Sequence, residues 1–445
     1  MGESLGADRR RFPLWPMGVL ALVNFVDQVD TAILRGVLPI LEDEWSLSDL
    51  QLGLLGFAFV FVNALATVPA GWLADHTRRT RLIGWTLLSW SGLIVLSATA
   101  VNYLNLLAAR AVMGIGQSVD DPASTSLLGD YYPSRLRARA FSLQQISLFV
   151  GGGIGLALGG YVGTTLGWRW AFALVGMPGS VVALLAFRLR EPVRGESDLP
   201  EGATVEAADP QDDQSLGQFA RRARAELGSE LRMIFGIRTM RYILVGVAAL
   251  LFTVSGIGYW LAVYHQRYSD MSVGEATAFT ALVLGVGGGI GTLVGGIASD
   301  RLHRRVTGGR ILLVVWSSVA CALLFLVSFS IQPVPLRLAL QFFGVMAAAG
   351  AVPGLRASML DVVPAESRGV GASAFALTAA VFGTALAPPL VGLLSDLTSL
   401  VGAFYIVFPP VILGLLLLLR ARHTVDADAD ALVAALVARS SAAAG

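Results

Sequence analysis

The chain is 445 residues long; 55% of the residues are hydrophobic and only 14% are charged, and the mean hydropathy is +0.68. Soluble domains carry about 25% charged residues, so this composition excludes an ordinary globular protein, and the net charge of +1 gives no indication of a nucleic-acid partner. All basic residues are arginine, which excludes a P-loop lysine, a Schiff-base lysine and the lysine motif of P-type pumps. Work against a gradient must therefore use another gradient or a separate ATPase subunit.

Apolar runs of membrane-spanning length recur along the whole chain. The first, at about 15–40, is too long for a signal-peptide core, so we expect a retained first helix. Further runs lie at about 50–72, 82–100, 104–129, 140–163, 170–189, 241–264, 276–298, 310–330, 337–361, 369–394 and 400–419. The sequence predicts twelve transmembrane helices, divided into an N-terminal six-helix bundle (1–190), a cytoplasmic linker (191–239), a C-terminal six-helix bundle (240–422) and a cytoplasmic tail (423–445).

The linker changes character along its length. Its first half is acidic and poor in large apolar residues, which is typical of disorder. Its second half mixes arginines with Phe219, Leu227 and Leu231, a pattern that predicts an amphipathic helix on the inner leaflet. We interpret the segment as a tether between the halves, with binding of a specific partner as the alternative.

Arginine placement predicts the orientation of the spans. Alternate loops are rich in arginine, whereas the opposite loops contain few arginines and include the acidic segment 42–44. By the positive-inside rule both termini lie in the cytoplasm. We therefore expect a multi-pass protein of the plasma membrane.

The two halves repeat one another. A Gly71…Asp75…Arg78-Arg79 segment after the second span matches Gly296…Asp300-Arg301…Arg304 after the eighth. Five further pairs keep one constant offset along the chain: Pro122 with Pro353, Asp130 with Asp361, Pro133 with Pro364, Arg137 with Arg368 and Ser142 with Ser373. The sequence thus predicts an all-α membrane protein built from two pseudo-symmetric six-helix bundles.

These motifs, together with Arg110-x-x-x-Gly114-x-Gly116 and Trp168-Arg-Trp-Ala-Phe172, resemble those of the major facilitator superfamily. Within it, Asn24-Phe-Val-Asp27 and Gly114-Ile-Gly116 are most similar to spinster-like lysolipid transporters. The resemblance implies a transporter with a lipid substrate. Spinster proteins usually carry arginine and glutamate where this chain has Gln28 and Gln117, so proton coupling by that glutamate does not carry over.

Charged residues within predicted spans indicate a wet cavity, because a charge at the centre of a span costs about 2.5–3.5 kcal/mol on insertion scales. Asp27, Asp30 and Arg35 fall on one face of the first helix, and Arg110 faces the same way as Gln117 in the fourth. With a helical rise of about 1.5 Å per residue, Asp27 and Arg110 reach similar depths, so we expect them to pair.

We therefore predict alternating access, in which protonation of Asp27 releases Arg110 to bind an anionic head group; a static structural pair is the alternative. Four aspartates are candidates for proton coupling: Asp27, Asp30, Asp120 and Asp121. The candidates for binding substrate in the cavity are Asn24, Gln28, Thr31, Arg35, Arg110, Gln117, Trp260, Tyr264 and Arg356.

Charged residues at the cytoplasmic ends of the spans are candidates for gating. They are Asp75, Arg78, Arg79, Asp130, Arg137, Asp300, Arg301, Arg304, Asp361 and Arg368. They form either latches that break when the halves rock or solvated surface pairs worth under about 1 kcal/mol each. The glycine-rich segments 151–160 and 285–296 lie within apolar spans and predict close helix packing rather than a nucleotide loop.

The function that the sequence favours is proton-coupled secondary transport of an amphipathic, anionic lipid such as a lysophospholipid. The alternative is a transporter of the same fold for a small organic anion, sugar acid or drug. There is no nucleophile–base pair or metal cluster, so we expect neither an enzyme nor a cofactor, only a proton gradient as the energy source. The expected partners are the bilayer and the substrate, and the expected state is a monomer.

Overall fold

The computed structural model describes residues 14–194, 232, 234–363, 368–425 and 427–428, with side chains throughout except at 68, 75, 134–135, 138–139 and 368–370. Most of the predicted linker and tail therefore lies outside the described residues. Every regular element in these ranges is a helix.

The first half contains six membrane helices. They are α1 (Leu14–Trp45), α2 (Asp49–His76), α3 (Arg79–Ser97), α4 (Tyr103–Gln117) continued by α5 (Asp120–Tyr131), α6 (Ser134–Thr165) and α7 (Trp168–Ala186). The break between α4 and α5 has a cause in the sequence, because Pro122 offers no N–H to the carbonyl of Ser118. α2 begins at a capping box in which Ser48 and Gln51 satisfy one another's backbone N–H groups.

The second half also contains six, two of them interrupted by π-helical turns. They are α9 (Arg238–Tyr268); α10 (Val273–Leu282), η2 (Val283–Gly287) and α11 (Gly288–His303); α12 (Gly309–Ser330); α13 (Val334–Val362); α14 (Arg368–Thr378), η4 (Ala379–Ala385) and α15 (Ala387–Leu397); and α16 (Leu400–Leu417) with the 3₁₀ turn η5 (Leu418–His423). Ten of the helical rods in the described part of the chain are long and apolar enough to cross a membrane by themselves.

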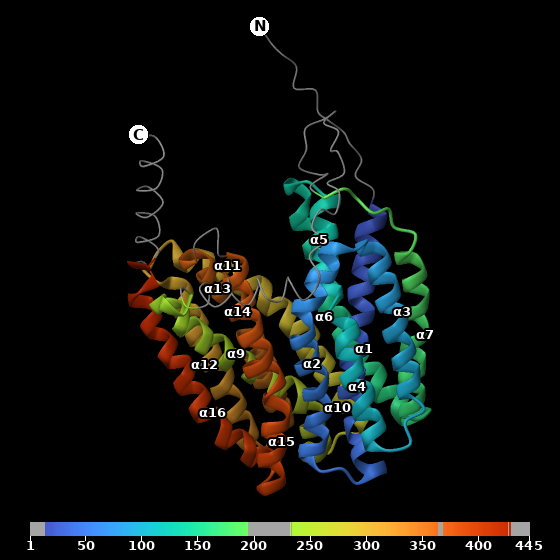
Figure 1. The fold of residues 1–445 in the computed structure, drawn as a ribbon. Helices are drawn as coiled ribbons and strands as arrows, with labels where there is room; N and C mark the ends of the chain where they lie inside the picture. The colour runs from blue at the N-terminus through green and yellow to red at the C-terminus, as the bar shows by residue number, and fades with distance from the viewer. Residues whose placement is uncertain (1–13, 195–231, 233, 364–367, 426, 429–445) are drawn as a thin grey trace.

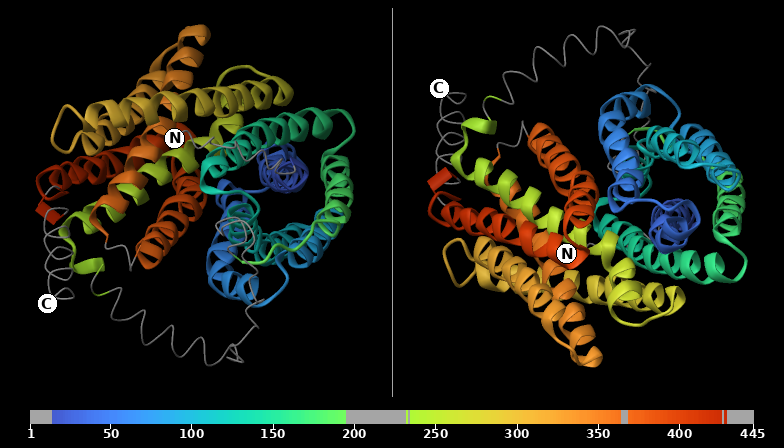
Figure 2. Two further views of the ribbon diagram at one scale, coloured as in Figure 1. Left: turned by 90° about the horizontal axis from the view of Figure 1, so that it is seen from above. Right: turned by 90° about the horizontal axis from the view of Figure 1, so that it is seen from below.

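The two halves form bundles that stand side by side (Figures 1 and 2). α1 begins and η5 ends on one side of the molecule, which is at the top in Figure 1 and is called the terminal side below. The loop between α1 and α2 lies on the opposite side, called the far side. The predicted fold class is confirmed: the protein is an all-α membrane protein with two six-helix bundles.

Glycines let the helices of each bundle approach closely. On α6, an added Cβ at Gly155 would lie 2.3 Å from the carbonyl oxygen of Val29 on α1, and one at Gly159 would lie 2.6 Å from that of Ile33. In the second half, a Cβ at Gly295 would lie 2.2 Å from Gly350 on α13. The glycine-rich segments therefore do pack helix against helix, as the sequence predicts.

The internal repeat appears as a repeated contact. Arg79 at the start of α3 forms an ion pair with Asp130 at the end of α5, and Arg310 at the start of α12 forms one with Asp361 at the end of α13, at 2.5 Å. Both members of the second pair follow those of the first at the constant offset of the sequence repeat.

Candidate functional site

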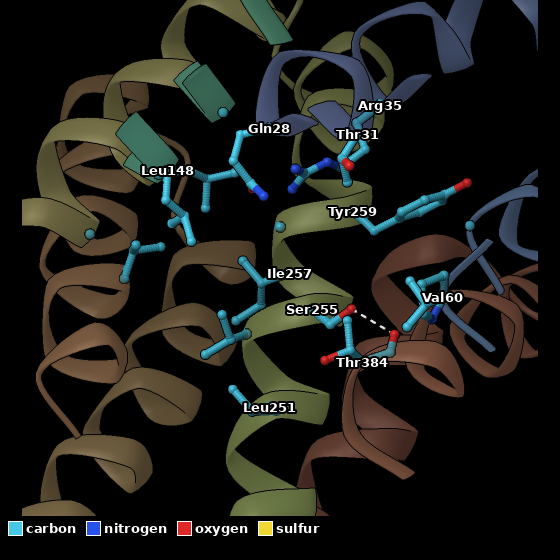
Figure 3. Close-up of a pocket in the computed structure, with 18 of the residues that line it drawn as sticks. Gln28, Thr31, Arg35, Val60, Leu148, Leu251, Ser255, Ile257, Tyr259 and Thr384 are labelled. Carbon is cyan, nitrogen blue, oxygen red and sulfur yellow. Dashed lines mark hydrogen bonds between the residues drawn. The ribbon is translucent and has the colours of Figure 1, made fainter. Parts of the chain in front are cut away.

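A cavity of about 480 Å³ lies between the two bundles, within the size range of small-molecule sites. α1, α2, α4 and α6 of the first half and α9, η2, α11, α12, α13, η4 and α15 of the second half supply its wall. Most of the wall is aliphatic or aromatic, with residues such as Leu148, Leu251 and Ile257 (Figure 3). The cavity is therefore an apolar chamber whose shape depends on both halves.

Two arginines from the first half give the chamber its charge. Arg35 on α1 lies beside Thr31 and Gln28 in Figure 3, and it makes no hydrogen bond or ion pair with any residue that the structure describes. Its Nη1 reaches across to α9, where it would lie 3.8 Å from a Cβ added at Gly258. Such a half-buried cation in an apolar wall is suited to binding an anion.

The second cation, Arg110, is 1% exposed and lines the same cavity. Its Nη1 lies 3.7 Å from Asp30 Oδ1, and its guanidinium carbon lies 4.8 Å from the centroid of the Phe172 ring. Its Nε and Nη2 atoms are buried and have no hydrogen-bond partner among the described residues. Only part of the hydrogen-bonding capacity of Arg110 is therefore used inside the protein.

The carboxylate that faces Arg110 is that of Asp30, not of Asp27. Asp30 is fully buried and its Oδ2 accepts a hydrogen bond of 2.8 Å from Gln117. The predicted pair between Asp27 and Arg110 is thus wrong by one helical turn, because estimates of depth from rise per residue do not separate two acids three positions apart on one face.

Asp27 belongs to a neighbouring acidic group instead. Its Oδ2 accepts a hydrogen bond of 2.8 Å from Gln28, and it lies within electrostatic range of Asp120, Asp30 and Asp121. Asp120 is buried and accepts 2.8 Å from Ser124 Oγ, whereas Asp121 is exposed. The four predicted coupling aspartates therefore gather between α1 and the start of α5, with Asp30 alone against a cation.

Of the nine predicted cavity residues, four line the chamber: Gln28, Thr31, Arg35 and Arg110. Gln117 stands behind them, against Asp30, and Asn24 is outside the lining with its Oδ1 buried and unpaired among the described atoms. Arg356 is exposed on α13 and lies outside the lining.

The expectation that Trp260 and Tyr264 line the cavity is wrong. Trp260 is fully buried and donates from Nε1 to the carbonyl of Pro388 at 3.1 Å, and Tyr264 stacks among Tyr268 and Phe329 within the second bundle. The face of α9 that lines the chamber instead carries Ser255, Gly258 and Tyr259. Neither this face nor Thr384 on η4 was predicted, because a largely apolar helix gives little sign of which side meets the cavity.

On the far side, polar contacts join the two bundles. Arg267 at the end of α9 binds both oxygens of Asp49 at the start of α2, at 2.9 and 2.5 Å, and also Glu42 at 2.8 Å. Asp396 at the end of α15 accepts from the backbone N–H groups of Asp49 and Leu50, at 2.8 and 3.0 Å. Asp396 therefore caps the N-terminus of a helix in the other half.

Close backbone contacts reinforce this junction. A Cβ at Gly392 on α15 would lie 2.3 Å from the carbonyl oxygen of Asp49, and one at Gly160 on α6 would lie 1.9 Å from Thr277 Oγ1 on α10. Tyr259 also donates its hydroxyl hydrogen to the carbonyl of Leu52 at 2.5 Å. The contacts described between the two halves, both polar and steric, therefore lie at the far side or at the far end of the cavity.

The predicted gating residues that the structure resolves act within one half. Arg79 is 2% exposed and binds Asp130 and, at 2.9 Å, Glu191. Arg137 donates to the backbone carbonyls of Gly129 and Tyr132 at the end of α5. These bonds hold the ends of helices of the first bundle together.

In the second half, the arginine that pairs with the predicted gating aspartates is not one of the predicted arginines. Asp300 and Asp361 both bind Arg310, at 3.4 and 2.5 Å, rather than Arg301 or Arg304, which are exposed. Arg78 is also exposed, and the side chains of Asp75 and Arg368 are outside the described set. No group of three or more metal-ligating side chains occurs among the residues that the structure describes.

A family model for the Major Facilitator Superfamily matches residues 20–380. The chain belongs to the Major Facilitator Superfamily. It is a multi-pass membrane transporter, and its resemblance to spinster proteins is confirmed by the relatives below.

Relatives include the sphingosine-1-phosphate transporter SPNS2 of Danio rerio, with 25% identity over 67% of this chain and 59% of that protein. The 4-hydroxybenzoate transporter PcaK of Acinetobacter baylyi is 26% identical over 66% of this chain and 67% of that one. The fold matches the crystal structure of a bacterial homolog of the human lysosomal transporter Spinster in an inward-facing, unoccupied conformation, with a TM-score of 0.73 and 21% identity over 95% of this chain and 98% of that one.

Proposed function

We propose that this transporter carries an organic anion with an apolar body through the cavity between its bundles. The observation that carries the proposal is the pair of arginines, Arg35 and Arg110, whose guanidinium groups are held in an apolar wall with donors left free among the described residues. A phosphate or carboxylate accepts such donors with charge-assisted hydrogen bonds. The aliphatic remainder of the chamber accommodates the apolar part.

Two substrate classes fit this chemistry. A lysophospholipid-like anion is supported by the similarity to the sphingosine-1-phosphate transporter, and a small aromatic or aliphatic acid by the similarity to the 4-hydroxybenzoate transporter. Both relatives are named for anions that also carry a hydroxyl group. We favour the lipid, because the lining is mostly apolar, and keep the small acid as the second candidate.

Proton coupling is proposed to work through Asp30. When ionised, Asp30 holds Arg110 at 3.7 Å. Protonation removes that attraction and frees Arg110 for the substrate anion, so proton and anion bind together. Asp27, which lies within electrostatic range of both Asp30 and Asp120, would link the two on the route of the proton. No other cofactor is required.

The membrane arrangement follows from the arginine pattern. We propose that the terminal side faces the cytoplasm of the plasma membrane, since the arginine-rich loops lie there. The polar bridges between the halves that involve Arg267 and Asp396 then lie on the outer side of the membrane. A single chain contains the whole cavity, and we propose that the monomer transports.

The test is uptake into proteoliposomes under an imposed proton gradient, with labelled lysophosphatidate and labelled 4-hydroxybenzoate as probes. We expect Arg110→Gln and Arg35→Gln each to reduce uptake at least about tenfold, since each removes a charged hydrogen bond worth about 1.5–3 kcal/mol. Arg356→Gln is the matched control, because this arginine is exposed and outside the cavity. Asp30→Asn should abolish the response to the gradient. Uptake of neither probe by the wild type would contradict the proposal.

A further inference from the structure

We infer that the cavity selects anions that carry a hydroxyl group within about one ring's length of the anionic group, and that the Thr384 hydroxyl is the group that hydrogen-bonds to it. This inference rests on the proposed function and narrows its substrate class. Two observations support it. The second half contributes its own polar surface to the chamber, opposite the arginines of the first half, and the distance between the two surfaces limits the ligand.

The second polar surface consists of Ser255 on α9 and Thr384 on η4. Both line the cavity, and Figure 3 shows them joined by a hydrogen bond on the wall below Arg35 and Thr31. The hydroxyl of Ser255 donates to the backbone carbonyl of Thr384 at 2.9 Å. This pair is the main polar feature that the second half presents to the chamber besides Tyr259, whose hydroxyl is turned toward Leu52.

The sequence explains why Ser255 is needed there. A carbonyl at position 384 would receive a hydrogen bond from residue 388 in an α-helix or from residue 389 in a π-helix. Both positions are prolines, Pro388 and Pro389, which have no N–H. The carbonyl of Thr384 is therefore left without an α-helical or π-helical donor, and Ser255 donates to it from the neighbouring helix.

The bond between Ser255 and the carbonyl leaves two groups available to a ligand. Ser255 has used its only hydrogen, so its oxygen can still accept a hydrogen bond, and the Thr384 hydroxyl makes none with the described residues. The π-helical turn η4 places Thr384 on the lining, in keeping with the frequent use of such turns at functional sites. A ligand hydroxyl, which both donates and accepts, complements this pair.

The spacing from the cationic surface limits the ligand. Arg35 Nη1 approaches α9 at Gly258, and Ser255 precedes Gly258 by three residues on roughly the same face of that helix. Three residues rise about 4.5 Å along the helix axis. Because a hydrogen bond is added at each end, a hydroxyl bound at Ser255 and Thr384 lies between a few bonds and one benzene ring away from an anion bound at Arg35. This range includes the glycerol hydroxyl of a lysophosphatidate and, at its upper end, the para-hydroxyl of an aromatic acid.

The test compares two pairs of probes, each differing by one hydroxyl: 4-hydroxybenzoate with benzoate, and 1-acyl-lysophosphatidate with its 2-deoxy analogue. Equilibrium binding is measured on the full-length protein in nanodiscs, for the wild type, Thr384→Val, Arg35→Gln and Thr253→Val. The last variant is the matched control, since Thr253 bonds to the carbonyl of Ala249 on its own helix and is outside the lining.

We expect the hydroxylated member of at least one pair to bind about three- to tenfold more tightly to the wild type, as one hydrogen bond provides. The preference should disappear in Thr384→Val, persist in Thr253→Val, and persist at weaker affinity in Arg35→Gln. The probe pair that shows this preference tells whether the substrate is a lipid or a small acid. Equal binding within both pairs, or a preference that survives Thr384→Val, overturns the inference and leaves the anion transporter standing. If no probe binds the wild type, the inference and the proposed function are both overturned.

Discussion

The two sides of this transporter use their charged residues in different ways. On the terminal side, Arg79 and Arg310 tie the ends of helices together within their own bundle. On the far side, Arg267 and Asp396 join one bundle to the other. The difference indicates that each bundle is braced as a unit and that the junction between the units lies at the far side. Rocking of two braced units about the cavity would have to break the far-side contacts and would leave the terminal-side pairs intact.

Removing Arg79 should have the largest effect on stability. Arg79 is 2% exposed, and its loss removes one buried cation from both Asp130 and Glu191, which are 14% and 25% exposed. Breaking a buried pair in this way costs about 3–5 kcal/mol. We expect Arg79→Ala to lower the apparent melting temperature of the purified protein strongly, as followed by thermal denaturation with size-exclusion detection.

The repeat supplies the matched control. Arg310 occupies the equivalent position, but it is 18% exposed and its partners Asp361 and Asp300 are 39% and 64% exposed. Solvated pairs of this kind are worth under about 1 kcal/mol, so Arg310→Ala should change stability much less. Equal destabilisation by the two substitutions would show that burial does not decide the strength of these braces.

Crowding the far-side junction should shift the balance between conformations. A Cβ at Gly160 already overlaps Thr277 of the other half, so Gly160→Leu cannot be accommodated while α6 and α10 remain in contact. Overpacking costs about 1–3 kcal/mol. It therefore disfavours the far-side-closed form, in which the two bundles are in contact at the far side as in this structure, by about 5- to 150-fold. Gly296→Leu is the control, since a Cβ there meets nothing within 4 Å. Protection of the far-side loops against hydrogen exchange should fall in Gly160→Leu and stay unchanged in Gly296→Leu.

A smaller shift is expected from Asp396→Ala. The substitution removes the cap that Asp396 places on the N-terminus of α2 across the junction. Loss of an N-cap costs about 0.5–2 kcal/mol, and only the closed form loses it. The same exchange measurement should show a shift of about fivefold, smaller than that for Gly160→Leu. An unchanged protection pattern would mean that Arg267 and the close contacts at Gly392 and Gly160 hold the junction without this cap.

The sequence predicted most of the fold, because span length, glycine spacing and the constant offset between the two repeats are local or periodic signals. It also predicted the arginines of the cavity, because a charged residue is rare within an apolar span and therefore easy to recognise. It did not distinguish Asp30 from Asp27 as the partner of Arg110, because both lie on one face of α1 and differ by about one turn.

The sequence did not predict which faces of the apolar helices line the cavity or which residues form contacts between the two halves. Tyr259 meets the cavity and Tyr264 does not, although both lie on a helix that is apolar nearly all round. Asp49 and Arg267 are far apart in the sequence, and only the packing of the bundles brings them together. The prolines after Thr384 gave a usable signal, since a carbonyl without a donor requires a partner from another helix.

Rocking of the two braced bundles about the cavity can be measured by paired distances between spin labels. In a Cys321→Ala background, one pair of labels is placed on the far side at Val101 and Leu397, and another on the terminal side at Thr77 and His303, all four being exposed. Distances are measured by pulsed electron resonance with and without Gly160→Leu. If the bundles rock, the far-side distance lengthens and the terminal-side distance shortens together. A longer far-side distance with an unchanged terminal-side distance would exclude rocking.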